Sequence, residues 1–347
     1  MHTVTLQTHY HHVFRRRALI LIALAVALVL TLMLDLSAGP ASLSISDILS
    51  GLLNPENLEL RHRIILFEVR LPDALIALAV GAALGLSGIE TQTVLNNPLA
   101  SPFTLGISSF AAFGASIAII FAPSLPWLGH TAMLPLFALL FALLCGGLVL
   151  TFSQMLGGNR ENIVLIGIAL FFLGEALTSA MQYVGNAEAV QEIVFWSIGN
   201  LTKAGWTEVI VVTLCFFLIL PFSMRHVWVM TLLRAGEAQA QSLGLNIRRI
   251  RFFVILRVSI LCAFAICFVG VIAFVGLVGP HIARLLLGED HRLLVSGAAL
   301  CGALLLSLAS FLSKALMPGV IIPVGILTAI IGVPVFVLLI AGKRRRP

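Results

Sequence analysis

The chain has 347 residues, of which 60% are hydrophobic and only 10% are charged, and its mean hydropathy is +1.09. Soluble domains are about 45–50% apolar and about 25% charged, so the composition excludes a soluble globule, a disordered chain and a nucleic-acid-binding protein. The formal net charge of +6 does not alter this. The apolar residues suffice for about ten membrane spans of roughly 20 residues each.

The first apolar stretch, Ala18–Leu36, follows a polar segment at 1–17 that ends in three arginines. We read it as a retained span, because it is longer than a usual signal core and no convincing cleavage site follows it. Nine further stretches follow: Leu71–Ile89, Phe103–Ala122, Ala132–Phe152, Ile163–Tyr183, Val209–Phe222, Phe252–Phe274, Leu277–Leu287, Leu293–Leu312 and Ile321–Ala341. Backbone polar groups cannot remain unpaired in hydrocarbon. The sequence therefore predicts an all-α polytopic membrane protein with about ten transmembrane helices.

Basic residues are distributed unevenly between the connections. With ten spans both termini lie on one side of the membrane, and that side carries 15 of the 21 Lys and Arg residues, against five on the other side. The positive-inside rule places both termini in the cytoplasm. The expected organisation is a cytoplasmic tail at 1–17, one transmembrane permease domain at 18–341 and a basic cytoplasmic tail at 342–347.

The cytoplasmic segment around 231–249 combines good helix formers with Gly236 and Gly244. This pattern predicts two short helices with a glycine hinge, lying flat at the cytoplasmic face. An ordinary connector whose basic residues face lipid headgroups explains the same composition.

Motifs for chemistry are missing from the sequence. It has no G-x-x-x-x-G-K-[ST] phosphate loop and no Cys or His spacing typical of a metal site. We therefore expect neither an enzyme nor a chain that binds a cofactor or metal itself. Glu175 and Arg257 are the clearest ionisable residues within spans. For Glu175 we expect a wet cavity or a subunit interface, and for Arg257 a side chain that snorkels to the headgroups. Gly81 and Gly85 form a G-x-x-x-G pair that predicts close helix packing.

Five motifs in order carry a resemblance to a known family. They are Arg70-Leu-Pro followed by Val80–Gly88, then Asn97–Ser108, Gly236–Gly244, Phe274–Arg284 and Pro323–Pro334. Together they resemble the permease subunits of binding-protein-dependent ABC importers for ferric siderophores, haem and cobalamin, which have the type II importer fold. The resemblance covers about Arg15 to Arg346.

The resemblance implies a subunit of the bacterial inner membrane that pairs with a second copy or a paralogous permease. Two cytoplasmic ATPases would bind ATP and Mg, and a periplasmic or lipid-anchored binding protein would deliver the substrate. No nucleic acid is involved. By the same resemblance, the segment at 231–249 docks the ATPase. The expected coupling residues are Arg234, Gly236, Glu237, Ala240, Ser242, Leu243 and Gly244.

The resemblance also implies residues for docking and for transport. Arg70 and Lys314 are expected to receive acidic residues of the binding protein. Asp73 stands where the family usually has a second arginine, and Ile322 where it often has glutamate. Spans five and ten are expected to face the pore. The span-five candidates for the translocation pathway are Phe171, Phe172, Glu175 and Met181.

These observations predict a permease that imports a ferric siderophore with ATP hydrolysed by a partner subunit. Haem or cobalamin is the alternative cargo within the family. A secondary transporter with Glu175 as its proton relay is the alternative from another class.

Overall fold

The computed structural model describes residues 2–39, 43–121, 130–317 and 319–343, and every regular element in these ranges is helical. Each of the ten predicted spans overlaps one helix. These are α1 (His2–Ser37), α4 (Leu71–Val94), α5 (Ile107–Phe121), α6 (His130–Met155), α7 (Arg160–Val184), α9 (Trp206–Arg225), α12 (Ile247–Ile266), α13 (Val275–Leu287), α14 (His291–Ala315) and α15 (Val324–Lys343).

Shorter helices form the connections. They are α2 (Ile45–Leu53), α3 (Leu60–Ile64), α8 (Ala187–Ile198), α10 (Val227–Ala235) and α11 (Glu237–Ser242), with short turns of 3-10 helix at η1 (Pro55–Asn57) and η3 (Pro102–Leu105), and of π-helix at η2 (Ile65–Arg70). By length and composition, α1, α6, α7, α9 and α14 can each cross a membrane, while α5, α13 and α15 are apolar but shorter. The segment at 2–17, which belongs to the predicted N-terminal tail, is helical and continues into the first span.

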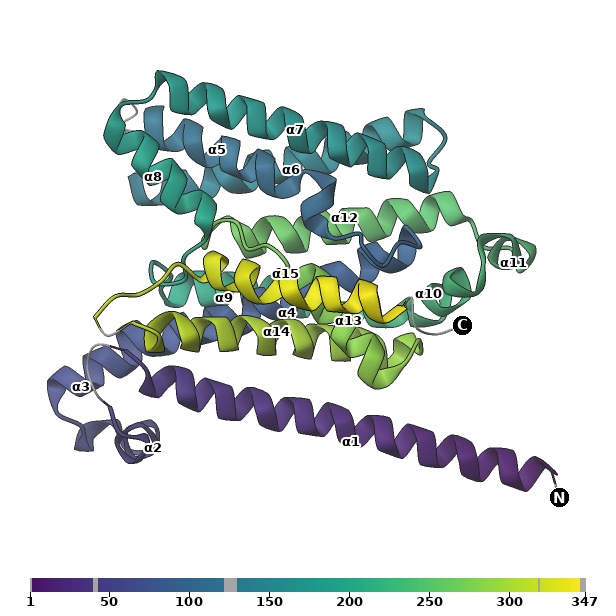
Figure 1. The fold of residues 1–347 in the computed structure, drawn as a ribbon, viewed down its shortest axis with the longest axis horizontal. Helices are drawn as coiled ribbons and strands as arrows, with labels where there is room; N and C mark the ends of the chain where they lie inside the picture. Colours follow the sequence, from purple (N-terminus) through teal and green to yellow (C-terminus); the bar gives the residue numbers. More distant parts are fainter. Residues whose placement is uncertain (1, 40–42, 122–129, 318, 344–347) are drawn as a thin grey trace.

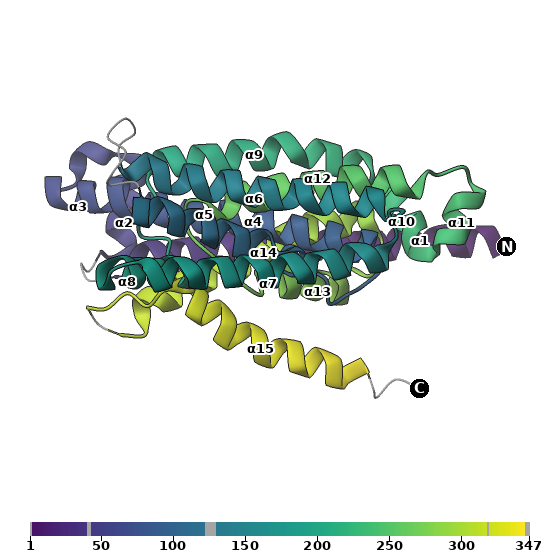
Figure 2. The same ribbon diagram turned by 90° about the horizontal axis from the view of Figure 1, so that it is seen from above.

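The helices run roughly side by side along the long axis (Figure 1). The beginning of α1, helices α10 and α11 and the end of α15 lie at one end of the bundle, whereas α2, α3 and α8 lie at the other. Helix α1 packs along α14 at one edge, and α7 packs on α5 at the opposite edge. After a quarter turn, α15 projects from one side and α9 lies on the other (Figure 2).

The centre of the bundle is the contact between α4 and α14, which small residues make possible. A Cβ atom built on Gly81 would lie 2.6 Å from the Gly302 carbonyl oxygen, and one on Gly85 would meet the Ala298 carbonyl. Backbones approach this closely only where side chains are absent. The G-x-x-x-G pair of α4 thus packs against a matching small-residue row on α14, as the sequence predicts.

A Gly81→Ala substitution is expected to destabilise the protein by about 1–3 kcal/mol, because overpacking forces the two helices apart. Gly147→Ala is the matched control, since nothing lies within 4 Å of a Cβ atom at Gly147 in α6. Thermal unfolding of both variants in detergent measures the difference. Equal melting temperatures would contradict the close contact.

The seventh span is shorter than predicted. Helix α12 ends at Ile266 and residues 267–274 form an irregular segment, although the apolar run continues to Phe274. Gly270 adopts φ +77°, and the Asn200 amide donates to the Val269 carbonyl at 2.7 Å. The irregular segment therefore lies beside the residues that follow α8. The hydrogen bond from Asn200 satisfies the Val269 carbonyl without a continuous helix.

Candidate functional site

An open hollow of about 330 Å³ lies against α7, near the end of the bundle that holds α8. It is bounded by η3, α5, α7, α8 and the irregular segment after α12. The lining residues are Phe103, Ser108, Ser109, Ala112, Phe171, Glu175, Thr178, Ser179, Gln182, Val194, Ser197, Ile198 and Val271.

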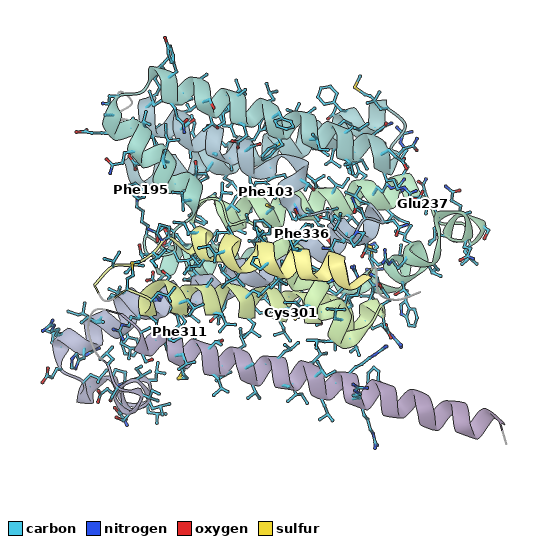
Figure 3. The ribbon with its side chains drawn as sticks, in the orientation of Figure 1. Phe103, Phe195, Glu237, Cys301, Phe311 and Phe336 are labelled. Atoms are coloured by element: carbon cyan, nitrogen blue, oxygen red, sulfur yellow. The ribbon has the colours of Figure 1, made fainter. Side chains whose placement is uncertain are left out.

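Glycines bring η3 and α5 close enough to α7 to form this wall. Gly106 ends η3 in the left-handed region at φ +79°, where a Cβ atom would lie 2.8 Å from the Phe171 amide nitrogen. A Cβ atom on Gly167 would lie 2.6 Å from the Thr104 carbonyl oxygen. The close approach sets the rings of Phe103 and Phe171 5.3 Å apart. Figure 3 labels Phe103 within this region.

Two of the four residues predicted for the pathway line the hollow, namely Phe171 and Glu175. Phe172 is 65% exposed and its ring packs on that of Phe171, 5.6 Å away. Met181 is half-buried on the same helix and is not among the lining residues. The structure thus groups Phe171 and Glu175 with Gln182 in the wall of the hollow. Phe172 and Met181 lie outside it.

The hydroxyl groups of the wall are oriented by their own helices. Ser109 donates to the Gly106 carbonyl, Thr178 to the Gly174 carbonyl and Ser179 to the Glu175 carbonyl, at 2.9–3.0 Å. With their protons used in this way, the oxygens present lone pairs to the hollow. The Glu175 carboxylate adds negative charge, and no basic side chain is among the lining residues. The wall therefore favours cations and hydrogen-bond donors over anions.

Apolar side chains are exposed next to the hollow and along α15. Leu165 and Phe172 on α7 and Ile330 and Val337 on α15 are all more than half exposed. Both helices lie toward the same side of the molecule (Figure 2). Continuous exposed apolar faces are typical of contact with lipid or another subunit.

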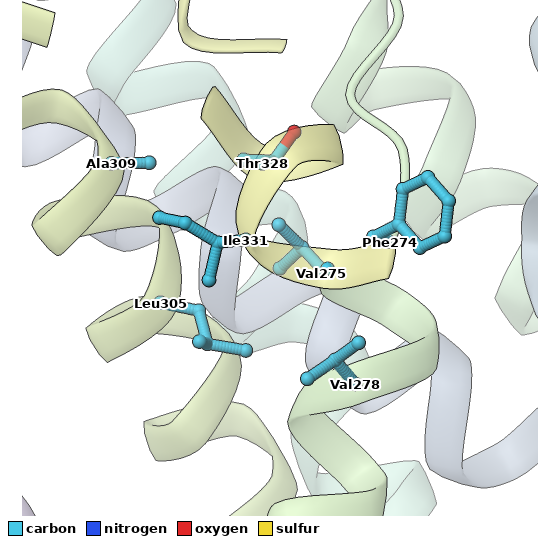
Figure 4. Close-up of a pocket in the computed structure, with 8 residues that line it drawn as sticks. Phe274, Val275, Val278, Leu305, Ala309, Thr328 and Ile331 are labelled. Carbon is cyan, nitrogen blue, oxygen red and sulfur yellow. The ribbon is translucent and has the colours of Figure 1, made fainter. Parts of the chain in front are cut away.

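A second cavity, of only about 20 Å³, lies between α13, α14 and α15 (Figure 4). Phe274, Val278, Leu305 and Ile331 line it together with four small or β-branched neighbours. A cavity of this size is close to the minimum for one water molecule, and apolar walls keep it dry. It is a packing defect beneath α15 and cannot hold a substrate.

The two short helices predicted for the segment at 231–249 are present, but the first begins earlier than 231. Helix α10 starts at Val227. Gly236, with φ +145°, separates it from α11, which ends at Ser242. Gly244 adopts φ +83° before α12 begins. The two positive φ values explain the two glycines, since other residues rarely adopt this conformation.

The coupling residues divide between an inner and an outer face. Ala240 is fully buried, whereas Ser242, Leu243 and Gly244 are exposed. Arg234 donates to Asn96 at 2.9 Å and pairs with Glu289 at 3.3 Å. The outer face is therefore free for a partner, and the inner face holds the element on the bundle.

Glu237 is the main anchor of α11 (Figure 3). Its carboxylate pairs with the buried Arg251 of α12 and lies 3.9 Å from Arg160, the first residue of α7. Arg251 also donates to the carbonyls of Val94 and Gly158. Arg251 and Arg160 were not predicted as partners of Glu237, because in the sequence they count only as positive charges on one side of the membrane. A glutamate placed 14 residues before an arginine in a basic run is too weak a signal to pair them.

Both residues predicted to dock the binding protein are buried in this structure. Arg70 is 5% exposed and donates to the Leu36 carbonyl at 2.6 Å. The Lys314 ammonium group pairs with Asp35 at 2.9 Å and lies 3.9 Å from Asp73, with 5% of its side chain exposed. Both charges are held by groups of this chain. Asp73, which departs from the family pattern, instead helps to neutralise Lys314.

The exposed basic residues at this end are elsewhere. Arg61 and Arg63 lie on α3, and Lys203 follows α8. These three remain available to a partner after the two buried residues are removed from the set.

The profile of the FecCD transport family matches residues 27–342. The chain belongs to this family. It is therefore a membrane-embedded ABC importer permease, not an enzyme, and it works with ATPase and substrate-binding-protein partners. The resemblance found in the sequence is confirmed, as is the predicted fold.

Individual relatives agree with this assignment. The hemin transport permease HmuU of Yersinia pestis is 36% identical over 282 residues, which cover 80% of this chain and 84% of the relative. The Fe(3+) dicitrate transport permease FecD of Escherichia coli is 36% identical over 285 residues, covering 82% and 87%. A solved inward-facing structure of an ABC transporter described as metal-chelate type has a TM-score of 0.82 at 32% identity, covering 93% of this chain and 99% of that one.

Proposed function

We propose that this permease imports a ferric chelate of the siderophore class, with the hollow against α7 as part of its pathway. The hollow carries the proposal, since it joins two aromatic rings, a set of hydroxyl oxygens and one carboxylate in an open wall of about 330 Å³. Its apolar surface suits the organic frame of a chelate. Its acceptor groups suit amide and hydroxyl donors on that frame.

The charge of the wall favours some cargoes over others. A small oxyanion needs concentrated donors or basic side chains, and the lining residues offer none of the latter. Neutral or cationic ferric chelates meet no such barrier. Relatives are named for hemin, for Fe(3+) dicitrate and for iron chelatin, which supports iron chelates as a class, although others are named for molybdate and for vitamin B12. Haem or cobalamin remains the alternative cargo.

The proposed assembly pairs this chain with a second permease through the exposed faces of α7 and α15. Two ATPases, which bind ATP and Mg, would engage α10 and α11, and a binding protein would engage the end that holds α2 and α3. Basic residues are in excess at the end that holds α10 and α11. This excess supports a cytoplasmic location for both termini in a bacterial inner membrane.

Glu175→Gln is expected to raise uptake of anionic ferric chelates several-fold relative to neutral ones. The substitution removes the negative charge from the wall and keeps its shape, and Glu175 lies within an apolar span, where ionisable residues are rare and tend to be functional. The measurement is competitive uptake of an anionic and a neutral ferric chelate by proteoliposomes that contain the full complex. Glu188→Gln is the control, because Glu188 lies on α8, is exposed and does not line the hollow.

The same preparation tests the proposal against a secondary transporter. We expect uptake to require ATP at the cytoplasmic face and to persist when an uncoupler collapses the proton gradient. Uptake driven by the gradient without ATP, and lost in Glu175→Gln, would overturn the proposal. An unchanged ratio of anionic to neutral uptake in Glu175→Gln would remove Glu175 from the pathway.

Docking of the binding protein is expected to depend on Arg61 and Arg63. Reversing both charges with Arg61→Glu and Arg63→Glu should slow association at low salt several-fold, since exposed charges act mainly on the encounter rate. Surface-plasmon measurements at two salt concentrations give the rates. A rate equal to that of the unmodified protein at low salt would place the docking surface elsewhere.

A further inference from the structure

A basic groove lies where the last turn of α6 meets the first turn of α12. It has a volume of about 450 Å³ and is lined by Gln154, Asn246, Arg248, Arg249, Phe252 and Phe253. It is distinct from the hollow against α7, with which it shares no lining residue.

The polar half of the groove is preformed. Arg248 donates from its Nε and Nη2 atoms to the side chain and the carbonyl of Gln154, which holds its guanidinium at the rim. The Arg249 amide donates to the Asn246 side-chain oxygen at 3.0 Å, which caps the start of α12. The Arg249 side chain is exposed to solvent. No acidic side chain is among the lining residues. The groove therefore presents two positive charges to an anion.

The other half of the groove is apolar and exposed. Phe253 is 50% exposed. Phe152 and Met155 on the last turns of α6, and Leu156 directly after it, are exposed as well. Arginine next to exposed phenylalanine at the end of an apolar span is the composition of a membrane interface. An occupant that carries both a negative charge and hydrocarbon matches both halves.

The position of the groove favours lipid over a protein partner. Helix α12 packs against α6, α4 and α9. Helices α6, α9 and α12 lie on the side of the bundle away from α15 (Figure 2). The faces of α7 and α15, which we assign to the second permease, point the other way. The exposed side of α6 and α12 therefore meets the bilayer.

We propose that this groove binds the headgroup of an anionic phospholipid. A phosphate accepts hydrogen bonds from the two guanidinium groups, and the acyl chains lie along Phe253 and the end of α6. The inference does not depend on which chelate is transported.

Native mass spectrometry of the purified permease in neutral detergent tests the proposal. We expect dioleoylphosphatidylglycerol to remain bound in preference to dioleoylphosphatidylcholine. Each basic side chain near an anionic surface contributes about fivefold in affinity, so Arg248→Gln with Arg249→Gln should weaken phosphatidylglycerol binding at least tenfold. Arg249→Gln alone, which leaves the Gln154 contacts intact, should show a smaller loss. Arg61→Gln with Arg63→Gln, an equal change of charge at exposed positions on α3 at the opposite end of the bundle, is the control.

Three outcomes would overturn the proposal. The first is equal retention of phosphatidylglycerol by the double variant and the unmodified protein. The second is displacement of phosphatidylglycerol by free glycerol phosphate as readily as by phosphatidylglycerol itself, which would make the groove a site for small anions. The third is loss of ATPase association in the double variant with lipid binding intact, which would assign the groove to the ATPase interface.

Discussion

Glu237→Arg is expected to abolish substrate uptake while the permease remains in the membrane. The carboxylate of Glu237 neutralises the buried Arg251 and lies near Arg160. An arginine in its place would bring three positive charges together, with one of them buried, and like charges at this distance repel strongly. Because Arg251 lies on α12 and Arg160 starts α7, the substitution detaches α11 from two helices of the bundle at once.

Three measurements separate loss of coupling from loss of folding: the amount of permease in the membrane, co-purification of the ATPase, and ATP-dependent uptake. Glu188→Arg is the matched control, since it makes the same charge change at an exposed position on α8, at the opposite end of the bundle from α11. We expect near-normal uptake from the control. Normal uptake by Glu237→Arg, with ATPase still bound, would show that this contact does not transmit force.

Hydrophobicity alone placed the spans because the bilayer demands long apolar helices. It failed where tertiary contacts replace helical hydrogen bonds, as at 267–274, where Asn200 pairs with Val269. Helix α8 was also missed, since its mixed polarity resembles that of a loop. The glycine hinge at Gly236 was predictable, because a residue that tolerates positive φ marks its own position.

Long-range charge pairs could not be predicted from one sequence. Arg70 and Lys314 were expected to dock the binding protein because they match docking positions of the family. The structure instead pairs Lys314 with Asp35, which lies 279 residues earlier in the chain. Similarly, Arg257 was expected to snorkel to the headgroups. It is instead 8% exposed and bound to Glu90 of α4, which the analysis of intramembrane charges did not single out.

This Glu90–Arg257 pair gives the largest expected effect on stability. The two groups are 2.8 Å apart and both are buried where α4 meets α12. Removing one partner of a buried pair costs about 3–5 kcal/mol, because the other charge is left uncompensated. Arg257→Met and Glu90→Leu are therefore each expected to lower the melting temperature strongly. Arg63→Met, at an exposed arginine on α3, should change stability by no more than about 0.5 kcal/mol.

The double variant with Glu90→Leu and Arg257→Met distinguishes two roles for the pair. Replacing a whole buried pair with apolar residues of similar volume is often neutral or stabilising. If the pair only fills space, the double variant recovers the melting temperature and the uptake of the unmodified permease. If the pair also fixes how α4 and α12 move during transport, stability recovers and uptake does not. Melting temperatures of the double variant as low as those of the single variants would contradict the assignment of Glu90 and Arg257 as mutual partners, since removing both charges leaves neither one uncompensated.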